Sequence, residues 1–291
     1  MPELPEVEVT RRRIAPFLVG RTVSKVRTGP PSYFFLTDPA VLRRRMRGRT
    51  FGDIERRGKY LLAGADDGSQ LVLHLGMTGQ LFPEGASSLR LLSATARASL
   101  SPESQVHFEG DQHTHLRVEF ADEGPDLLFR DVRKFGKALW LVRGESHERL
   151  QRLGPDALIF SGTQLFDASR GRQLPVKQLL LDQSIVAGIG NIYADESLYH
   201  AGIRPTRRAR RMRRRDCEGL ARSVREVLER AIASGGSSMS DFVAPDGQDG
   251  QYQAERRVYA RAGQPCYHCG SRIRRIVLGS RGAHFCPTCQ N

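Results

Sequence analysis

The first half of the chain has short segments that either alternate between apolar and polar residues or are compactly apolar, and turn residues bound them. Alternation with a period of two is typical of strands that have one buried face. Before these segments, residues 5–18 carry apolar side chains among arginines, with Pro5 suited to a first helical position and Gly20 to a helix stop. The pattern predicts a β-sandwich with a flanking helix, built from the segments TVSKVR, RTFGDIERRGKYLLAGA, SQLVLHLG, HLRVEF, PDLLFRDVRKFG and KALWLVRG.

The hydrophobic period changes near LGPDALIFSGTQ, where we place a domain boundary. Beyond it, residues 176–181, 192–200 and 216–234 have apolar spacings of three and four, which predict helices. The loop GGSSMSDFVAPDGQDGQYQ that follows is long enough to be either functional or mobile. Residues 83–106 are rich in Ser and Ala and are interpreted as a surface insertion. The predicted division is a β-sandwich domain at 1–152, a linker at 153–165, a helical domain with the long loop at 166–254, and a cysteine-bearing segment at 255–291.

The charge of the chain indicates a polyanionic partner. Lys and Arg total 45 against 32 for Asp and Glu, which gives a net charge of +13 and a pI near 10.1. Nucleic acid is the first candidate, and a solvated basic surface is the alternative. The sequence has no apolar run of membrane-spanning length, and its acidic start lacks the order of a secretory signal. We therefore expect a cytoplasmic protein.

Four of the five cysteines form two pairs near the end of the sequence. Cys266 and Cys269 make one CxxC pair, Cys286 and Cys289 make the other, and 16 residues separate the pairs. This spacing brings two such pairs onto one tetrahedral zinc, and four thiolates leave no position for water. One structural zinc is therefore predicted, in a hairpin whose arginines suit a phosphate backbone.

Two further segments contain candidate phosphate ligands. In AGIGNIYADE, glycines precede a predicted helix with Asn191 as its N-cap, which suits either a phosphate site or ordinary turn-and-cap chemistry. The run RPTRRARRMRRR has eight arginines in 12 residues and is more typical of a solvated face. Neither segment establishes a function alone.

Three short motifs in the first half contain candidate contact residues. Lys59 in RRGKYLL is one of only five lysines in the chain, and an amine can lose its proton near other cations where a guanidinium cannot. Met77 lies in a Gly-flanked turn, and Arg133 and Phe135 lie in a second loop. Each alone suits packing, but together they are side chains that a protein would insert into a DNA stack.

The start PELPEVE, the motifs RRGKYLL, HLGMTG, RDVRKFG and GIGNIYADE, and the four-cysteine finger together resemble the bacterial formamidopyrimidine-DNA glycosylase family. The six motifs occur in order and cover nearly the whole chain. The resemblance implies an α+β multidomain fold: an N-terminal β-sandwich with a flanking helix, a helix-two-turns-helix domain and a zinc-finger β-hairpin, with DNA held between the lobes. It also implies a monomeric, nucleoid-associated enzyme of base-excision repair that excises 8-oxoguanine and formamidopyrimidines from double-stranded DNA. Such an enzyme also cuts abasic sites by β,δ-elimination.

The resemblance also implies roles for individual residues. Pro2, freed by removal of Met1, would be the nucleophile, and Glu3 the acid that assists sugar-ring opening and proton transfer. Glu6 would be a supporting carboxylate, and Lys59 would contact the phosphate beside the lesion. The gap left by the flipped base would be filled by Met77, Arg133 and Phe135. Other DNA contacts would come from His74, Lys177, Asn191 and Arg281, and the metal ligands would be Cys266, Cys269, Cys286 and Cys289. The loop at GGSSMSDF…GQYQ would close over the extruded base.

The chemistry of a terminal proline agrees with this role. Attack of its secondary amine on the sugar C1′ gives an iminium cation, which acidifies the C2′ hydrogen and permits elimination of the 3′ phosphate. An α-amino group titrates near ~7.7–8.0, whereas an ordinary lysine titrates near ~10.4. An acid-rich helix start that only complements the helix dipole would explain Glu3 and Glu6 but not Pro2.

Some positions depart from the family pattern. Gln112 precedes His-Thr-His where the family commonly has Lys, Ser240 stands where some members have Lys, and the 83–106 segment is longer than usual. These departures affect the expected lesion preference and loop behaviour rather than the reaction. Two alternatives remain open from sequence: an endonuclease VIII type that acts on oxidised pyrimidines, against which Leu4 argues, and a noncatalytic zinc-dependent DNA-binding protein.

Overall fold

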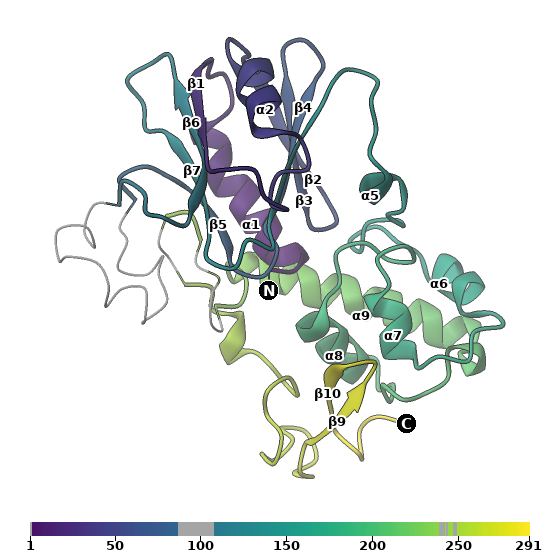
Figure 1. Cartoon of the computed structure of the whole chain (residues 1–291). Helices are drawn as coiled ribbons and strands as arrows, with labels where there is room; N and C mark the ends of the chain where they lie inside the picture. The colour runs from purple at the N-terminus through teal and green to yellow at the C-terminus, as the bar shows by residue number, and fades with distance from the viewer. Residues whose placement is uncertain (1, 87–107, 239–241, 243, 247–248) are drawn as a thin grey trace. The chain divides into compact units, whose positions relative to one another are not determined.

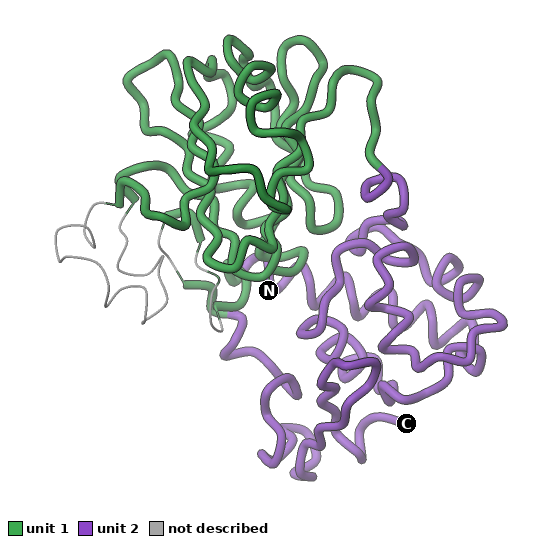
Figure 2. The backbone as a smooth tube through the Cα atoms, viewed as in Figure 1, with its two compact units in different colours: residues 1–147, 234–251 green, residues 148–233, 252–291 purple. Residues whose placement is uncertain are grey.

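The structure is a computed structural model that describes residues 2–86, 108–238, 242, 244–246 and 249–291. Ser240 and nearly all of the predicted 83–106 insertion lie outside the described residues. The chain divides into two compact units (Figure 2), unit 1 with residues 1–147 and 234–251 and unit 2 with residues 148–233 and 252–291. Unit 1 is therefore made from two separate stretches of sequence. The four-part division predicted from sequence stays a prediction.

Unit 1 contains two antiparallel four-stranded sheets (Figure 1), ordered β1-β6-β7-β5 and β2-β3-β4-β8. The alternating segments form their strands as predicted, and their apolar faces enclose one core that includes Phe34, Phe51, Phe129 and Trp140. The strands are β1 (Val23–Thr28), β2 (Phe51–Arg57), β3 (Tyr60–Ala65), β4 (Gln70–His74), β5 (Gly79–Pro83), β6 (Thr114–Phe120), β7 (Leu127–Asp131) and β8 (Lys137–Leu141).

Two helices accompany these sheets. The predicted first helix is α1 (Leu4–Ile14), and it packs against β2, β3 and β5. Its C-terminal end continues as the 3-10 helix η1 (Ala15–Phe17). The second helix, α2 (Pro39–Met46), was not predicted from sequence; Asp38 caps it by accepting hydrogen bonds from the N–H groups of residues 40 and 41. Strand β5 was also not predicted, and all its residues are buried.

Unit 2 is helical and ends in a β-hairpin. The helices predicted at 176–181, 192–200 and 216–234 are confirmed as α7 (Val176–Leu181), α8 (Asn191–His200) and α9 (Arg214–Ala233). Helix α6 (Gly162–Ser169) was missed; Ser161 and Gln164 form a capping box at its start, and it packs on α9. The remaining elements are α5 (Glu148–Gln151), η2 (Ala209–Arg211), η3 (Tyr252–Ala254), β9 (Arg274–Leu278) and β10 (Arg281–Phe285). Within the described part of the chain, no helix is long and apolar enough to cross a membrane.

Candidate active site and metal centre

The first residues of unit 1 are buried and tightly held. Pro2 is buried, and Glu3 is 2% exposed. The Glu3 N–H donates to Oε2 of Glu6 at 2.8 Å, and the Ser237 N–H donates to Oε1 of the same carboxylate at 2.8 Å. Gly236 has φ +82, and a Cβ there would lie 3.1 Å from Glu6 Oε1. Glu6 therefore fixes the helix start and joins it to the segment after Ser234.

Lys59 and His74 lie at neighbouring ends of β3 and β4. Lys59 is 8% exposed and follows Gly58, whose φ of +57 makes the turn between β2 and β3. Tyr60 pairs with His74 across the two strands, and their ring centroids are 4.7 Å apart. His74 Nδ1 accepts a hydrogen bond from the Gly76 N–H at 3.1 Å. His74 thus contacts both β3, which directly follows Lys59, and the turn that carries Met77.

Asp131 connects the two loops that carry Met77 and Phe135. It is fully buried. One oxygen accepts from Thr78 Oγ1 at 2.5 Å, and the other accepts from the Gly136 N–H at 2.6 Å. The Arg133 N–H also donates to Asp131, at 3.2 Å. Sequence reasoning missed this residue, although an Asp two residues before a loop N–H is the signal of an Asx turn.

The loops themselves touch and present exposed side chains. Gly76 has φ +65, and a Cβ there would collide with the backbone of Phe135 and Gly136. Phe135 is 42% exposed, and the Arg133 guanidinium lies 4.7 Å from its ring centroid. Tyr33, which the sequence analysis did not single out, is 56% exposed and donates its hydroxyl to the Arg133 carbonyl at 2.7 Å. The structure therefore brings Arg133 and Phe135 together beside the turn that carries Met77.

The four predicted zinc ligands lie together in unit 2. All four Sγ atoms are within 4.8 Å of one another, and the Cys266–Cys289 and Cys269–Cys286 pairs are 3.9 and 3.4 Å apart. A tetrahedral zinc with Zn–S bonds of about 2.3 Å places its thiolates about 3.8 Å apart. The donor set therefore fits one zinc with no open position for water, and such a zinc is structural.

Between the two cysteine pairs, β9 and β10 form a tight hairpin. Gly279 and Ser280 both have positive φ, of 52° and 63°, as a two-residue hairpin turn of type I′ requires. Arg281 is exposed at the first position of β10. A Cβ at Gly279 would collide with the side chain of Gln178 on α7. The predicted DNA-binding arginine therefore lies at the turn of a hairpin that packs against α7.

Lys177 lies under this hairpin with its side chain fully buried. Its ammonium is 2.6 Å from Asp195 Oδ1 and donates to the Gly282 carbonyl at 2.6 Å. The other Asp195 oxygen accepts from the His284 N–H at 2.8 Å. The lysine joins α7 and α8 to β10. Its predicted contact with DNA stays a prediction.

Asn191 differs from its prediction by one position. Gly190 is the N-cap of α8, and Asn191 is its half-buried first residue. The GIGN turn is held by Gln183, which accepts from the Gly188 N–H at 3.0 Å and donates to the Ile189 carbonyl at 2.8 Å. The backbone amides at this helix start remain suited to a phosphate. Gln112 is exposed in the turn before β6, and its effect on lesion preference stays a prediction.

Three family models match the chain in order. Residues 1–138 match the formamidopyrimidine-DNA glycosylase N-terminal domain, residues 153–243 match the H2TH domain of the same glycosylase, and residues 263–291 match the zinc finger found in FPG and IleRS. The ranges include the N-terminal residues, the loops of unit 1, the GIGN turn and the cysteines. Most of the chain is thus covered.

Whole-chain comparisons agree with the domain matches. The formamidopyrimidine-DNA glycosylase of Pseudomonas entomophila is 42% identical, with 100% of both chains covered. The crystal structure of MutM (Fpg) from Thermus thermophilus has a TM-score of 0.83 at 38% identity, covering 99% of this chain and 98% of that one. A Lactococcus lactis FPG mutant in complex with Fapy-dG containing DNA has a TM-score of 0.84 at 32% identity, with 100% of both chains covered.

Proposed function

Because the chain belongs to the formamidopyrimidine-DNA glycosylase family, we propose that Pro2, after removal of Met1, is the nucleophile of its reaction. The protein is a DNA glycosylase of base-excision repair with AP lyase activity, and its partner is double-stranded DNA that contains oxidised bases or abasic sites. We propose oxidised purines, including formamidopyrimidines and 8-oxoguanine, as its substrates. We further propose that it acts as a monomer at the nucleoid in the cytoplasm.

The observation that carries the proposal is the buried start of unit 1. Pro2 is buried beside Glu3, and Glu6 holds that start through hydrogen bonds from Glu3 and Ser237. A nucleophile acts efficiently only when it is held in place, and fixing an otherwise frayed end supplies that order. The dipole interaction of Glu3 and Glu6 alone would not require Pro2 to be buried.

The reaction follows from the chemistry of a secondary amine. The nitrogen lone pair of Pro2 forms a bond to the sugar C1′ while the bond from C1′ to the base breaks, and the base leaves with its electron pair and gains a proton. Opening of the sugar ring gives an iminium cation, and loss of a C2′ proton expels the 3′ phosphate. A second elimination expels the 5′ phosphate. Glu3 is the acid that we assign to the ring-opening and later proton transfers.

The remaining residues of the site bind and position DNA in this proposal. Lys59 contacts the phosphate beside the lesion, and Met77, Arg133 and Phe135 fill the gap left by the extruded base, which costs a few kcal/mol to unstack. Further contacts with phosphates come from Asn191 and Arg281, and His74 positions the Met77 turn. The zinc, held by the four cysteines, fixes the hairpin that carries Arg281.

Borohydride reduction during turnover tests the assignment of the nucleophile. We expect a covalent adduct between protein and lesion-containing duplex, with the peptide map placing the link on Pro2 and showing Met1 absent. A Lys59→Ala variant, which should bind DNA less well but still form the same adduct, is the control. An adduct on Lys59, or full activity in a protein that retains Met1, would overturn the assignment.

A further inference from the structure

Unit 1 contains a cavity between helix α2 and strand β1 that has no place in the reaction described above. Its volume is about 650 Å³, and it is lined by residues 24–26 of β1, by Ala40, Arg43 and Arg44 of α2, and by Arg47, which directly follows α2. In Figure 1, α2 and the N-terminal residues lie at opposite ends of unit 1. The cavity is therefore separate from the candidate active site.

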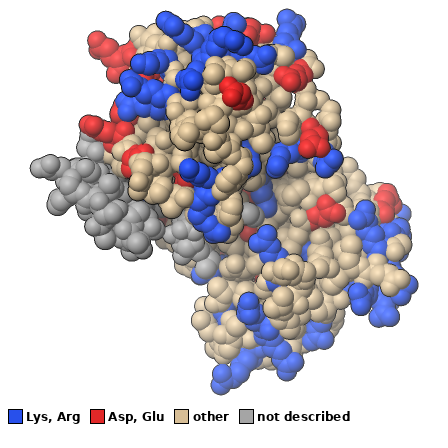
Figure 3. Space-filling view, in the orientation of Figure 1, with Lys and Arg blue, Asp and Glu red and all other residues tan. Residues whose placement is uncertain are grey.

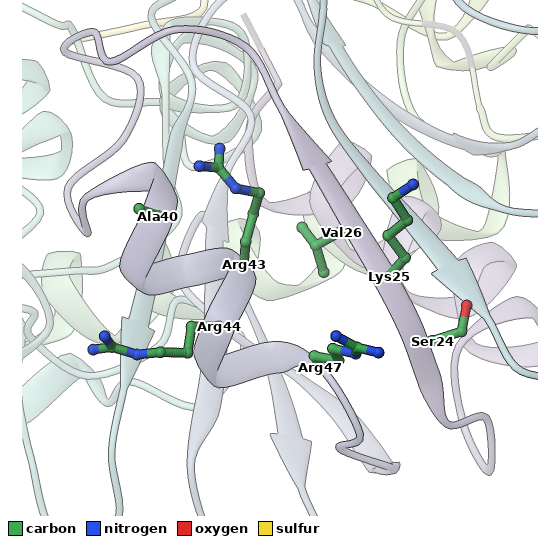
Figure 4. Close-up of a pocket in the computed structure, with 7 residues that line it drawn as sticks. All are labelled: Ser24, Lys25, Val26, Ala40, Arg43, Arg44 and Arg47. Carbon is green, nitrogen blue, oxygen red and sulfur yellow. The ribbon is translucent and has the colours of Figure 1, made fainter.

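The basic lining follows the helical repeat. Residues 40, 43 and 44 are spaced at i, i+3 and i+4, so they form one exposed stripe along α2, and Arg47 follows the helix as its C-cap with an extended backbone. The neighbouring stripe, with Leu42 and Met46, is buried in the core. Figure 4 shows Val26 directed from β1 toward α2, with Arg43 and Arg47 along the gap between the two elements and Arg44 pointing away from β1. The cavity thus has an apolar floor and a cationic rim.

The rim cations differ from neighbouring arginines of unit 1 in their partners. Arg49 pairs with Asp67 at 3.0 Å, and Arg27 pairs with Glu119, the residue opposite Lys25 in the strand register. Among the residues that the structure describes, no acidic side chain forms an ion pair with the four rim cations at 25, 43, 44 and 47. Arg43, Arg44 and Arg47 place three like charges within five residues, and such charges repel one another. An anionic partner would remove this cost.

We propose that this cavity binds a short acidic segment of a partner protein, one that carries at least one apolar side chain. Guanidinium groups bind carboxylates through paired hydrogen bonds, and the apolar floor at Val26 accepts a hydrophobic side chain. The volume falls within the roughly 300–1,000 Å³ of cavities that hold small ligands, which suits a few peptide residues. Carboxylates of the segment lie along the rim, and its apolar side chain lies over Val26 and Ala40.

A second DNA segment fits these observations less well. Phosphates would satisfy the arginines but would make no apolar contact with the floor, where Ala40 is exposed and Val26 is the edge of the core of unit 1. Figure 3 shows Lys and Arg side chains over the part of unit 1 that carries α2, so general attraction for polyanions is the main competing explanation. Arginines near a helix C-terminus also complement the helix dipole. Arg45 shares that benefit in the last turn of α2 without lining the cavity, so it separates these explanations.

The test measures binding of a fluorescein-labelled peptide of alternating aspartate and leucine to the full chain by fluorescence polarisation. Arg43→Glu and Arg47→Glu should each weaken binding by about tenfold, since one charged hydrogen-bonding group is lost. Arg45→Glu, with the same charge change on the same helix, should alter it by less than about twofold. A peptide with serine in place of leucine should bind more weakly. Cutting of lesion-containing duplex should be unchanged in all three variants.

Several outcomes would overturn the proposal. Equal losses for Arg43→Glu and Arg45→Glu would show general charge attraction, and equal affinity of the serine and leucine peptides would show a plain anion site. Binding of undamaged duplex at α2 is the third such outcome. If the duplex binds more tightly than the peptide and Arg43→Glu abolishes that binding, the surface belongs to nucleic acid. Thermal unfolding of each variant checks that the helix remains folded. Because strand cutting is measured separately, failure here leaves the proposed reaction intact.

Discussion

The loops of unit 1 that carry Met77 and Phe135 are held by hydrogen bonds. The hairpin of unit 2, formed by β9 and β10, is held by an ion pair and by the cysteine ligands of a zinc. In unit 1, the Asp131 carboxylate accepts from Thr78 and from loop N–H groups. In unit 2, four cysteines close the ends of the hairpin, and the Lys177–Asp195 pair lies beneath it. Both arrangements present an exposed arginine, Arg133 in a loop between strands and Arg281 directly after a hairpin turn.

The two arrangements differ in the free energy of folding that is lost when one of their interactions is removed. A buried N–H group that loses its acceptor costs about 1–3 kcal/mol. A structural zinc site contributes an apparent ~10–16 kcal/mol, and breaking a buried ion pair costs about 3–5 kcal/mol. Perturbing the hairpin should therefore unfold it, whereas perturbing the loops should only loosen them.

The largest effect is expected from removal of the metal. Cys286→Ser should lose zinc and reduce DNA affinity by roughly two orders of magnitude, because the proposed phosphate contacts of the hairpin are lost, while unit 1 stays folded. Metal analysis and DNA titration measure this. Cys217→Ala, which removes a buried thiol outside the cluster, should keep both zinc and affinity. Unchanged affinity in the metal-free variant would show that the two regions do not differ in this way.

The buried ion pair should give the second largest effect. Asp195→Ala leaves the Lys177 ammonium without a counter-charge, so the free energy of unfolding of unit 2 should fall by about 3–5 kcal/mol. Combining Lys177→Met with Asp195→Leu removes both charges and should restore part of that loss. Urea unfolding monitored by hydrogen exchange of β10 amides makes the measurement. A double variant as unstable as the sum of the single variants would contradict the pairing.

Loosening of the unit 1 loops should affect one substrate and spare another. In Asp131→Ala the loop N–H groups lose their acceptor, so excision from lesion-containing duplex should slow by about 10- to 100-fold. Cutting at a preformed abasic site, which needs no base extrusion, should change by less than about threefold. Met77→Ala with Phe135→Ala should give the same split. Glu123→Ala, which removes an exposed acid of unit 1, is the matched control, and equal slowing on both substrates would assign Asp131 to general stability.

The smallest effect concerns a carboxylate on α1. Burial alone would raise the pKa of Glu8, but hydrogen bonds from Arg11 and Arg12 and the charge of Arg56 lower the pKa to about 2. A lowered pKa stabilises the folded state above the ordinary value of 4.5, and this contribution is lost as pH falls from 4.5 toward 2. Glu8→Gln should therefore cost about 1–2 kcal/mol at pH 7 and much less near pH 2. A pH-independent cost, from urea midpoints, would contradict this account.

The sequence predicted strands from compact apolar segments between turn residues, as in β1, β2, β4 and β7, and from alternation, as in β3. Helix α9 has a clear period. Helix α2 does not, because its three consecutive arginines leave only Leu42 and Met46 as internal signals. Strand β5 is buried on both faces, like the predicted β7, but Leu81 and Phe82 are its only large apolar residues and they lie close to Gly79 and Pro83.

The candidate site shows the same division. Its exposed residues and cysteines were predictable because their residue types indicate chemistry. Asp131, Asp195 and Glu196 were not, since a charged residue in a sequence normally lies at the surface. Glu196 is fully buried and accepts the N–H groups of residues 257–259 at 2.8–3.0 Å, a role that only the tertiary structure reveals. Lysines also normally lie at the surface, so the sequence did not predict the burial of Lys177 and suggested a contact with DNA.

Unit 1 is built from two separate stretches of sequence, and this affects how it forms during synthesis on the ribosome. Glu6 meets Ser237, and Val9 packs with Phe242 and Ala244, only after the whole of α9 has been translated. At about 5–20 residues per second, this interval lasts some tens of seconds at the slower rates. The nascent N-terminus lacks these partners throughout that time. Cleavage of the initiator methionine therefore has a window before the late segment arrives and packs against the first helix.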